Sequence, residues 1–252
     1  MHLRKIYFTN RRGYILASAL DLPDKGNAGT FAMLVPCFTC TKDLKAMVNI
    51  SSALTDEGIA VFRFDFTGLG ESEGNFTDMN YSKMLEDMVD AAEYLKNNFG
   101  EPKLLAGHSL GGCIVLETAN SIPSVKAVVT IASPSEPSNL SGKLPKTRQK
   151  ALRDGIAETE IGGVKFKLTR DFFEDIESHH LEPFIRKLKK PLLVMHSPAD
   201  TYGSIENGLN IFETAGQPKS FISLDNIDHL MLNKVDARYV GKLIAVWAKK
   251  YL

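Results

Sequence analysis

The sequence contains a serine inside a glycine-flanked turn, Gly107-His108-Ser109-Leu110-Gly111, which has the pattern G-x-S-x-G. A short apolar run, 103–106, precedes this turn, and a helix-like segment, 112–120, follows it. In a sharp turn between a strand and a helix, a serine hydroxyl projects above the sheet, where a substrate carbonyl can reach it. This order favours Ser109 as a nucleophile over the alternative, a tight glycine turn that happens to contain a serine.

A serine hydroxyl is a weak nucleophile at neutral pH unless a base accepts its proton and a third group orients that base. After such a turn, first an acid and then a histidine are expected just past the carboxyl ends of later strands. Asp200 follows the apolar run 191–195, and His229 follows the run 220–224. The sequence therefore predicts a catalytic triad in which His229 is the base for Ser109 and Asp200 orients His229.

The other histidines and acids are less well placed in the chain. Of the six histidines, only His229 lies after the last predicted strand. We expect His179 and His180 to lie on a solvated helix face and His196 to be a packed residue at a strand end. The alternatives to Asp200 as the acid are Asp225, Asp228 and Glu206.

Acyl transfer at a serine also requires two hydrogen-bond donors for the oxygen of the tetrahedral intermediate. The backbone N–H of the residue after the nucleophile, Leu110, is one expected donor. The second normally comes from the loop after an early central strand, which in this chain is 36–43. Within that loop, Phe38 is the residue whose backbone N–H we expect to donate.

The chain has three cysteines, of which Cys37 and Cys40 form a C-x-x-C pattern. That pattern is typical of a redox pair or of half a zinc site, but no second cysteine pair completes a zinc site. We favour two small buried hydrophobic residues, because free cysteines are mostly buried. On this basis we expect no disulfide, no metal, and a reducing, cytoplasmic compartment.

Length and composition are those of one globular domain over residues 1–252, with 44% hydrophobic and 24% charged residues. Lys plus Arg and Asp plus Glu both number 30, so the charge balance gives no reason to expect nucleic acid or an anionic membrane as a partner. We find no signal-peptide pattern and no apolar run near the roughly 18 residues that would span a bilayer. We expect a small-molecule ester as the partner, and the oligomeric state stays open, with a homodimer among the options.

Apolar runs alternate with helix-like periodicity along most of the chain, which predicts a mostly parallel sheet with helices on both faces. The last helix is expected to begin after Asn233 as N-cap. Residues 135–190 interrupt the alternation without a confident sheet strand, so we interpret them as a cap or lid insertion; the alternative is a solvated helical excursion. The apolar face expected for the last helix is Val235, Tyr239, Leu243, Val246 and Trp247.

A second glycine-rich turn, 63–72, follows the predicted strand 59–64. We expect Asp65 and Ser72 to tie this turn together through hydrogen bonds to the backbone. The alternative, a phosphate cradle at Gly68-Leu69-Gly70, lacks the further residues of a complete phosphate-binding motif.

The G-x-S-x-G turn, the D-x-x-G-x-G-x-S turn, the Asp200 turn and the Asp228-His229 pair together resemble the α/β-hydrolase superfamily, over nearly the whole chain. More narrowly, the C-F-T-C-x-K-D loop, the R-F-D-F-T-G-L-G-E-S-E-G turn and the H-S-P-A-D turn are similar to esterase-like hydrolases sometimes fused to an OsmC-like domain. We expect no such second domain, because the printed sequence ends with its last predicted helix. Many superfamily members begin the oxyanion loop with His-Gly, where this chain has Pro36-Cys37.

The resemblance implies an α/β-hydrolase fold of about eight strands, no metal or cofactor, and acyl transfer to water. The resulting hypothesis is a serine-dependent carboxylesterase that forms an acyl-enzyme on Ser109. The alternatives are a peptidase, amidase or thioesterase with the same triad, or a non-catalytic binding protein that keeps the fold.

Overall fold

A central eight-stranded sheet organises the chain in the computed structural model, which describes residues 2–24 and 29–252. Its strand order is β1-β2-β4-β3-β5-β6-β9-β10, with β1 and β2 antiparallel to their neighbours and the remaining pairs parallel. The predicted mostly parallel sheet of about eight strands is therefore confirmed. The strands are β1 His2–Thr9, β2 Ile15–Leu22, β3 Thr30–Val35, β4 Ile59–Phe64, β5 Pro102–His108, β6 Ala127–Ile131, β9 Leu192–His196 and β10 Lys219–Ser223.

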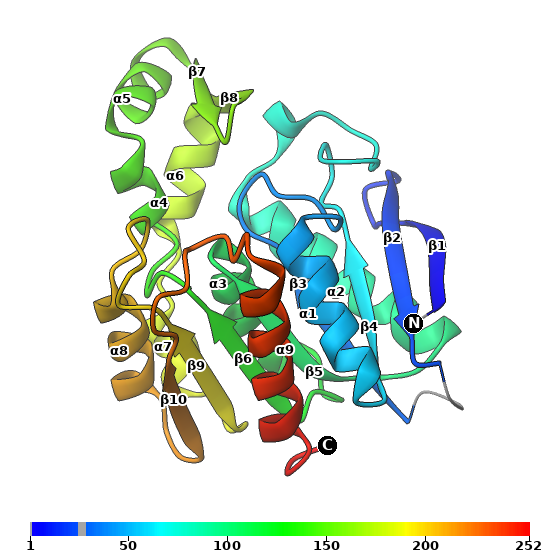
Figure 1. Cartoon of the computed structure of the whole chain (residues 1–252). Helices are drawn as coiled ribbons and strands as arrows, with labels where there is room; N and C mark the ends of the chain where they lie inside the picture. Colours follow the sequence, from blue (N-terminus) through cyan, green and yellow to red (C-terminus); the bar gives the residue numbers. More distant parts are fainter. Residues whose placement is uncertain (1, 25–28) are drawn as a thin grey trace.

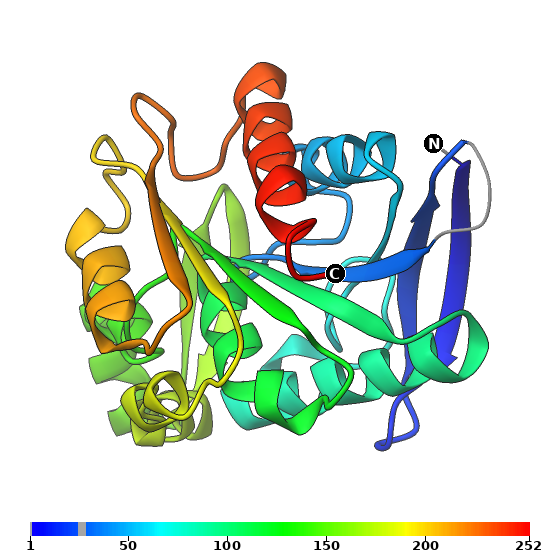
Figure 2. The ribbon, with the colours of Figure 1, turned by 90° about the horizontal axis from the view of Figure 1, so that it is seen from below.

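The central strands are apolar on both sides because helices cover both faces of the sheet. Every residue of β4 and of β6 is buried, as expected of parallel strands between two helical layers. Figure 2 shows α1 and α9 on one side of the sheet and α2 and α3 on the other. The helices outside residues 135–190 are α1 Lys45–Asp56, α2 Tyr81–Asn98, α3 Leu110–Thr118, α8 Ile205–Thr214 and α9 Lys234–Ala248, with short 3-10 helices at Phe76–Asp78 and Ala119–Ser121.

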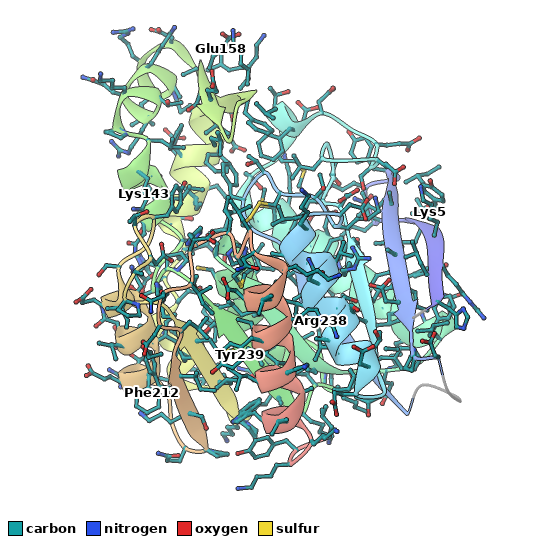
Figure 3. The ribbon with its side chains drawn as sticks, viewed as in Figure 1. Lys5, Lys143, Glu158, Phe212, Arg238 and Tyr239 are labelled. Carbon is teal, nitrogen blue, oxygen red and sulfur yellow. A yellow bond between two sulfur atoms is a disulfide. The ribbon has the colours of Figure 1, made fainter. Side chains whose placement is uncertain are left out.

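The expected apolar face of α9 is wrong in large part. Val235, Tyr239 and Val246 are exposed at 71%, 50% and 69%, and Figure 3 labels Tyr239 on this helix. The buried face instead combines four small residues with Val240 and Ile244, and α9 packs closely against α1 at Gly241. At Gly241 an added Cβ would lie 2.7 Å from the Cβ of Ala53, so a larger side chain would separate the two helices. The buried residues of α9 are Ala237, Val240, Gly241, Ile244, Ala245 and Ala248.

The start of α9 does follow the predicted pattern. The side-chain oxygen of Asn233 accepts a hydrogen bond from the backbone N–H of Val235 at 2.9 Å. This bond satisfies one of the backbone donors that the first turn of a helix leaves free, so Asn233 is the N-cap.

Residues 135–190 form a separate group of elements between β6 and β9, and most of them extend upward from the sheet in Figure 1. They contribute no strand to the central sheet, but they contain an antiparallel hairpin that the sequence analysis missed. The hairpin turn is Gly162-Gly163, and both residues have positive φ, which is a recognisable signal for a two-residue turn. The elements are α4 Asn139–Lys143, α5 Pro145–Asp154, β7 Ile156–Ile161, β8 Val164–Thr169, α6 Arg170–Ser178 and α7 Glu182–Arg186.

A helix that spans a bilayer must be about 20 residues long and mostly apolar. Across residues 2–24 and 29–252, no helix is both long and apolar enough to cross a membrane.

Candidate active site

Ser109 occupies the sharp turn between β5 and α3 that the sequence predicts. Its φ is 53°, a conformation that side chains rarely adopt, and its backbone N–H donates to the oxygen of Ile131 at 2.9 Å. The two glycines of the motif are required by close contacts. A Cβ at Gly107 would lie 2.1 Å from the Gly111 oxygen, and one at Gly111 would lie 2.5 Å from the Val35 oxygen. The turn can therefore form only where both flanking side chains are absent.

The structure brings Ser109, His229 and Asp200 together from three separate strand ends. The Nε2 atom of His229 lies 3.2 Å from the Ser109 hydroxyl oxygen, and its Nδ1 atom lies 2.7 Å from Oδ2 of Asp200. Because an ionised carboxylate only accepts hydrogen bonds, Nδ1 carries the proton and Nε2 is free to accept one from Ser109. These contacts have the geometry by which a base activates a nucleophilic hydroxyl.

The second oxygen of Asp200 is held by the backbone. Its Oδ1 accepts hydrogen bonds from the N–H groups of Tyr202 and Gly203, both at 2.8 Å. Burial raises the pKa of Asp200, but the hydrogen bonds from His229 and these two amides outweigh burial and hold the pKa below its ordinary value. Asp200 is therefore ionised at neutral pH, as an orienting carboxylate must be.

The other candidate acids make different contacts. Asp228 accepts hydrogen bonds from the backbone N–H groups of Leu230 and Leu232 at 2.9 and 3.2 Å, within its own loop. Asp225 accepts a hydrogen bond from the Ser223 hydroxyl at 2.7 Å. Asp200 is thus the acid that the structure places against His229.

His108, inside the G-x-S-x-G turn, makes a contact that the sequence analysis did not anticipate. Its Nε2 atom lies 2.7 Å from the backbone oxygen of His229. Burial lowers the pKa of His108 to about 3, so the ring is neutral and donates through Nε2–H. The residue before Ser109 therefore holds the loop that carries His229.

His196 is packed at the end of β9, as expected. It is fully buried, its Nε2 atom contacts the Gly203 oxygen at 3.0 Å, and burial lowers its pKa. It packs beneath the Asp200 turn, with its Nε2 atom 3.6 Å from Oδ2 of Asp200.

The expected solvated position of His179 is wrong. Its side chain is 17% exposed, and its Nδ1 atom lies 2.8 Å from Oε1 of Glu117 on α3. Its Nε2 atom lies 3.0 Å from the Ser82 hydroxyl, and its ring packs edge-on against Tyr81. The neighbouring His180 is exposed. Because these partners come from α2 and α3, they could not be inferred from the local sequence around position 179.

The two expected oxyanion donors, Phe38 and Leu110, line one small pocket. Leu110 is the first residue of α3, where a backbone N–H has no acceptor within the helix. Phe38 lies in the loop after β3, and its ring packs against Phe76 at 5.6 Å and against Phe172 of α6 at 5.3 Å between centroids. The 135–190 segment therefore contacts the donor loop directly.

The expectation of two free cysteines in this loop is wrong, because Cys37 and Cys40 form a disulfide. A hydrogen bond from Cys40 N to Cys37 O at 3.1 Å, with φ of 61° at Thr39, closes a turn and brings the two Cα atoms to 5.2 Å. That separation lies within the range a disulfide needs. The disulfide encloses Phe38, and it removes the cysteine argument for a reducing compartment.

The end of the donor loop is anchored to the turn after β4. The backbone N–H of Lys42 donates to Oδ1 of Asp65 at 2.6 Å, and its buried ammonium lies 3.0 Å from Oδ2. Burial lowers the pKa of Lys42, but hydrogen bonds to Glu71, Asp65 and Asp43 outweigh burial and raise it. The Ser72 hydroxyl donates to the backbone carbonyl oxygen of Asp65 at 2.7 Å. This bond agrees with the structural role predicted for both residues.

Two further residues border the site on the His229 side. The ring of Tyr202 packs on His229 with 4.8 Å between centroids, and the Lys143 ammonium lies 5.0 Å from the Tyr202 centroid. Figure 3 labels Lys143 where the 135–190 segment leaves the sheet. No sequence motif marks these positions, since the contact depends on where the segment folds back.

The doubly covered parallel sheet and the serine turn between β5 and α3 define an α/β hydrolase. The chain belongs to the family described as serine aminopeptidase, S33, whose model matches residues 41–167, about half of the chain. This membership places it among hydrolases that have esterase and thioesterase relatives.

Solved structures give the same architecture. The esterase domain of a Rhodothermus marinus protein is 39% identical, with a TM-score of 0.80, and the match covers 100% of this chain and 99% of that one. The mouse alpha/beta hydrolase domain-containing protein 10 has a TM-score of 0.80 at 21% identity, covering 98% of this chain and 99% of that one. At that lower identity the likeness shows the fold alone.

Curated sequences give a more partial match. The mitochondrial palmitoyl-protein thioesterase ABHD10 of Mus musculus is 25% identical over 186 residues, which is 71% of this chain and 62% of the mouse protein. The rat counterpart is 30% identical over 102 residues, 40% of this chain and 33% of the rat protein. The chain therefore spans less than two thirds of the length of these relatives.

Proposed function

We propose that this protein is a serine hydrolase that cleaves carboxylic esters through an acyl-enzyme on Ser109. The observation that carries the proposal is the continuous contact from the Ser109 hydroxyl through His229 to Asp200, at 3.2 and 2.7 Å. In this arrangement His229 accepts the Ser109 proton as the oxygen attacks the substrate carbonyl. Asp200 stabilises the imidazolium that forms, because its lowered pKa keeps it charged.

The intermediate and its breakdown use the same small set of groups. The carbonyl oxygen, now negatively charged, takes hydrogen bonds from the backbone N–H groups of Phe38 and Leu110. His229 then gives its proton to the leaving alcohol through Nε2, and the acyl group stays on Ser109. A water molecule repeats the attack with His229 again as base, which releases the acid and restores the hydroxyl.

We further propose that residues 135–190 act as a cap over this site. Phe172 of this segment packs on Phe38, and Lys143 of the same segment packs on Tyr202, so the segment contacts both the donor side and the His229 side. Ser109 is only 9% exposed beneath it. A cap of this kind limits the access of bulk water to the reacting carbonyl.

Thioester hydrolysis is the second candidate, favoured by the likeness to palmitoyl-protein thioesterases. A thiolate leaves more readily than an alkoxide, so the same triad would need less help from the proton on His229. The family description also names an aminopeptidase, and amide cleavage would make the strongest demand on that proton. Matched acyl esters, thioesters and anilides, compared by kcat/KM, rank the three bond types.

The direct test is labelling with a fluorophosphonate probe combined with hydrolysis of 4-nitrophenyl esters. We expect stoichiometric modification at Ser109, and loss of both labelling and turnover in Ser109→Ala. Ser124→Ala is a matched control, because the Ser124 hydroxyl donates to the Pro102 oxygen at the start of β5, far along that strand from Ser109. Turnover in Ser109→Ala equal to that of the unmodified chain would overturn the proposal, and absence of labelling would favour a non-catalytic binding protein.

A further inference from the structure

Helix α6 of the 135–190 segment has a polar face that lies against the main body of the protein. This polar face consists of Asp171, Asp175 and, directly after the last residue of the helix, His179, which are spaced four residues apart and therefore lie on one side. The side chains of Asp175 and His179 are only 18% and 17% exposed. Polar groups that are largely buried need hydrogen-bond partners, and here the partners come from α2 and α3.

The two aspartates of the polar face bind the beginning of α2. Oδ2 of Asp171 accepts a hydrogen bond from the side-chain amide of Asn80, the N-cap of α2, at 2.9 Å. Asp175 accepts hydrogen bonds from the backbone N–H and the hydroxyl of Ser82 at 2.8 and 2.6 Å. Because the first turn of a helix has unpaired N–H groups and a partial positive charge, it is a favourable place for both carboxylates.

His179 extends this contact to α3. The Ser82 hydroxyl gives its only proton to Asp175, so it accepts a hydrogen bond from Nε2 of His179 at 3.0 Å. Nδ1 of the same ring lies 2.8 Å from Oε1 of Glu117 and donates to that carboxylate. Directional hydrogen bonds therefore join α6 to both α2 and α3.

The apolar side of α6 reaches the expected oxyanion donor. Phe172 is 1% exposed, and its ring centroid lies 5.3 Å from that of Phe38. Phe173 and Ile176 are also buried on this helix. Apolar contacts have no preferred direction, so they do not by themselves prevent α6 from sliding along its axis. Hydrogen bonds require a narrow range of distances and angles, so the polar face is what fixes the register of the helix.

We propose that the polar face of α6 fixes the register of this helix and so holds Phe172 against Phe38. Asp171, Asp175 and His179 are then positioning residues for the expected oxyanion donor. A shift of α6 would leave a void beside the Phe38 ring, and the loop after β3 would move to fill it. The donor N–H would then leave the position where the carbonyl oxygen becomes negatively charged. The inference rests on the proposed ester hydrolysis.

The test compares a 4-nitrophenyl ester with the matching thionoester, in which sulfur replaces the carbonyl oxygen. Sulfur is a weak hydrogen-bond acceptor, so oxyanion donors contribute less to cleavage of the thionoester. In Asp175→Ala we expect kcat for the ester to fall about tenfold, less than the 10²–10³ typical for full loss of a donor, with little change in KM. The rate for the thionoester should change much less. Asp175→Asn keeps an acceptor for the Ser82 N–H and should recover part of the loss.

Two further variants make the test specific. Glu174→Gln is the matched control, because Glu174 is an exposed acid on the same helix but outside the polar face. If Asp175 acts through Phe172, Asp175→Ala combined with Phe172→Leu should lose less than the product of the two separate losses. Fluorophosphonate titration normalises each rate to the concentration of intact sites. If Asp175→Ala does not fold, Asp171→Asn and Asp175→Asn serve for the same comparison.

Three outcomes are decisive. A loss that is selective for the ester, coupled to Phe172 and absent in Glu174→Gln supports the inference. Equal losses for ester and thionoester, or independent effects of the Asp175 and Phe172 substitutions, overturn it while leaving ester hydrolysis intact. No hydrolysis of any ester by the unmodified chain overturns the proposed function itself, and the positioning role with it.

Discussion

The Nε2 atom of His108 lies 2.7 Å from the backbone oxygen of His229, so the residue before the proposed nucleophile holds the loop that carries the proposed base. This bond joins β5 to the segment after β10, across two intervening strands of the sheet. It therefore links Ser109 to His229 by a second route, separate from the contact between their side chains.

The His108 bond gives a prediction about rate. In His108→Ala we expect kcat to fall roughly 3- to 10-fold with little change in KM, as expected for the loss of a hydrogen bond worth about 0.5–1.5 kcal/mol. His108→Gln keeps an N–H donor and should recover part of the loss. A large rise in KM with unchanged kcat would show that His108 acts on substrate binding instead.

The Asp200 carboxylate gives a prediction about the proposed triad. Asp200→Asn should lower kcat by up to about 10⁴-fold, because an amide can donate to Nδ1 and leave His229 in the tautomer that cannot accept the Ser109 proton. Asp228→Asn is the matched control, since Asp228 adjoins His229 in sequence but accepts only backbone N–H groups of its own loop in the contacts described above. Equal losses in the two variants would contradict the assignment of Asp200.

The disulfide around Phe38 gives a prediction about both stability and rate. Cys37→Ser combined with Cys40→Ser should lower the free energy of unfolding by about 2 kcal/mol. This is the contribution expected when a disulfide that closes so short a loop no longer restricts the unfolded chain. We expect kcat to fall about tenfold, less than the 10²–10³ typical for full loss of an oxyanion donor, because Lys42 and Asp65 still anchor the loop end.

Reduction of the Cys37–Cys40 disulfide in the unmodified chain provides a comparison for the double serine variant. A phosphine reductant should reproduce both changes in the unmodified protein and have no further effect on the double serine variant. If reduction leaves kcat unchanged while the disulfide is shown to be open, the donor loop keeps its shape without the bond.

The contact between His179 and Glu117 gives a prediction about pH. The hydrogen bond with Glu117 raises the pKa of His179, and burial opposes it only in part. The groups that face the ring are Glu117 on α3, Asp175 on α6, and Tyr81 with Ser82 on α2. A raised pKa in the folded state means that the stabilisation is complete below the unfolded value of about 6.5 and is lost as pH rises through the higher folded value.

Urea unfolding across pH 5.5 to 8.5 checks this prediction. The stability advantage of the unmodified chain over His179→Asn should be largest at the acid end and should decline as pH rises. His180→Asn, which changes the exposed neighbouring histidine, should leave the pH dependence unaltered. Parallel pH profiles for the unmodified chain and His179→Asn would contradict the proposed contribution of this contact.

Patterns local in the sequence predicted the sheet, and they named the three residues Ser109, Asp200 and His229 that the structure brings into contact. The turn at Ser109 depends on glycines within two residues, and Asp200 and His229 follow strands whose apolar runs are visible in the chain. The contacts that escaped prediction are set by packing. Val235 and Tyr239 are large apolar side chains of α9, yet they face outward, and at the point where α1 approaches most closely the helix carries Gly241.

The same reason explains the errors at the cysteines and at His179. Spacing alone cannot show whether the loop between Cys37 and Cys40 turns tightly enough to pair them, and the positive φ of Thr39 appears only in the fold. The surroundings of His179 come from α2 and α3, more than sixty residues away along the chain. Long-range proximity of this kind leaves no periodic trace in the sequence.

The contact of Gly111 with the Val35 oxygen has a consequence for how this enzyme class can diversify. Because the backbone of Gly111 lies this close to the backbone of Val35, the distance between the Ser109 turn and the loop after β3 does not depend on which side chains line the pocket. Mutations at the pocket walls can therefore accumulate under selection for new substrates while the reacting geometry is inherited unchanged. In this fold, substrate specificity can therefore change in evolution without a change in the backbone geometry around Ser109.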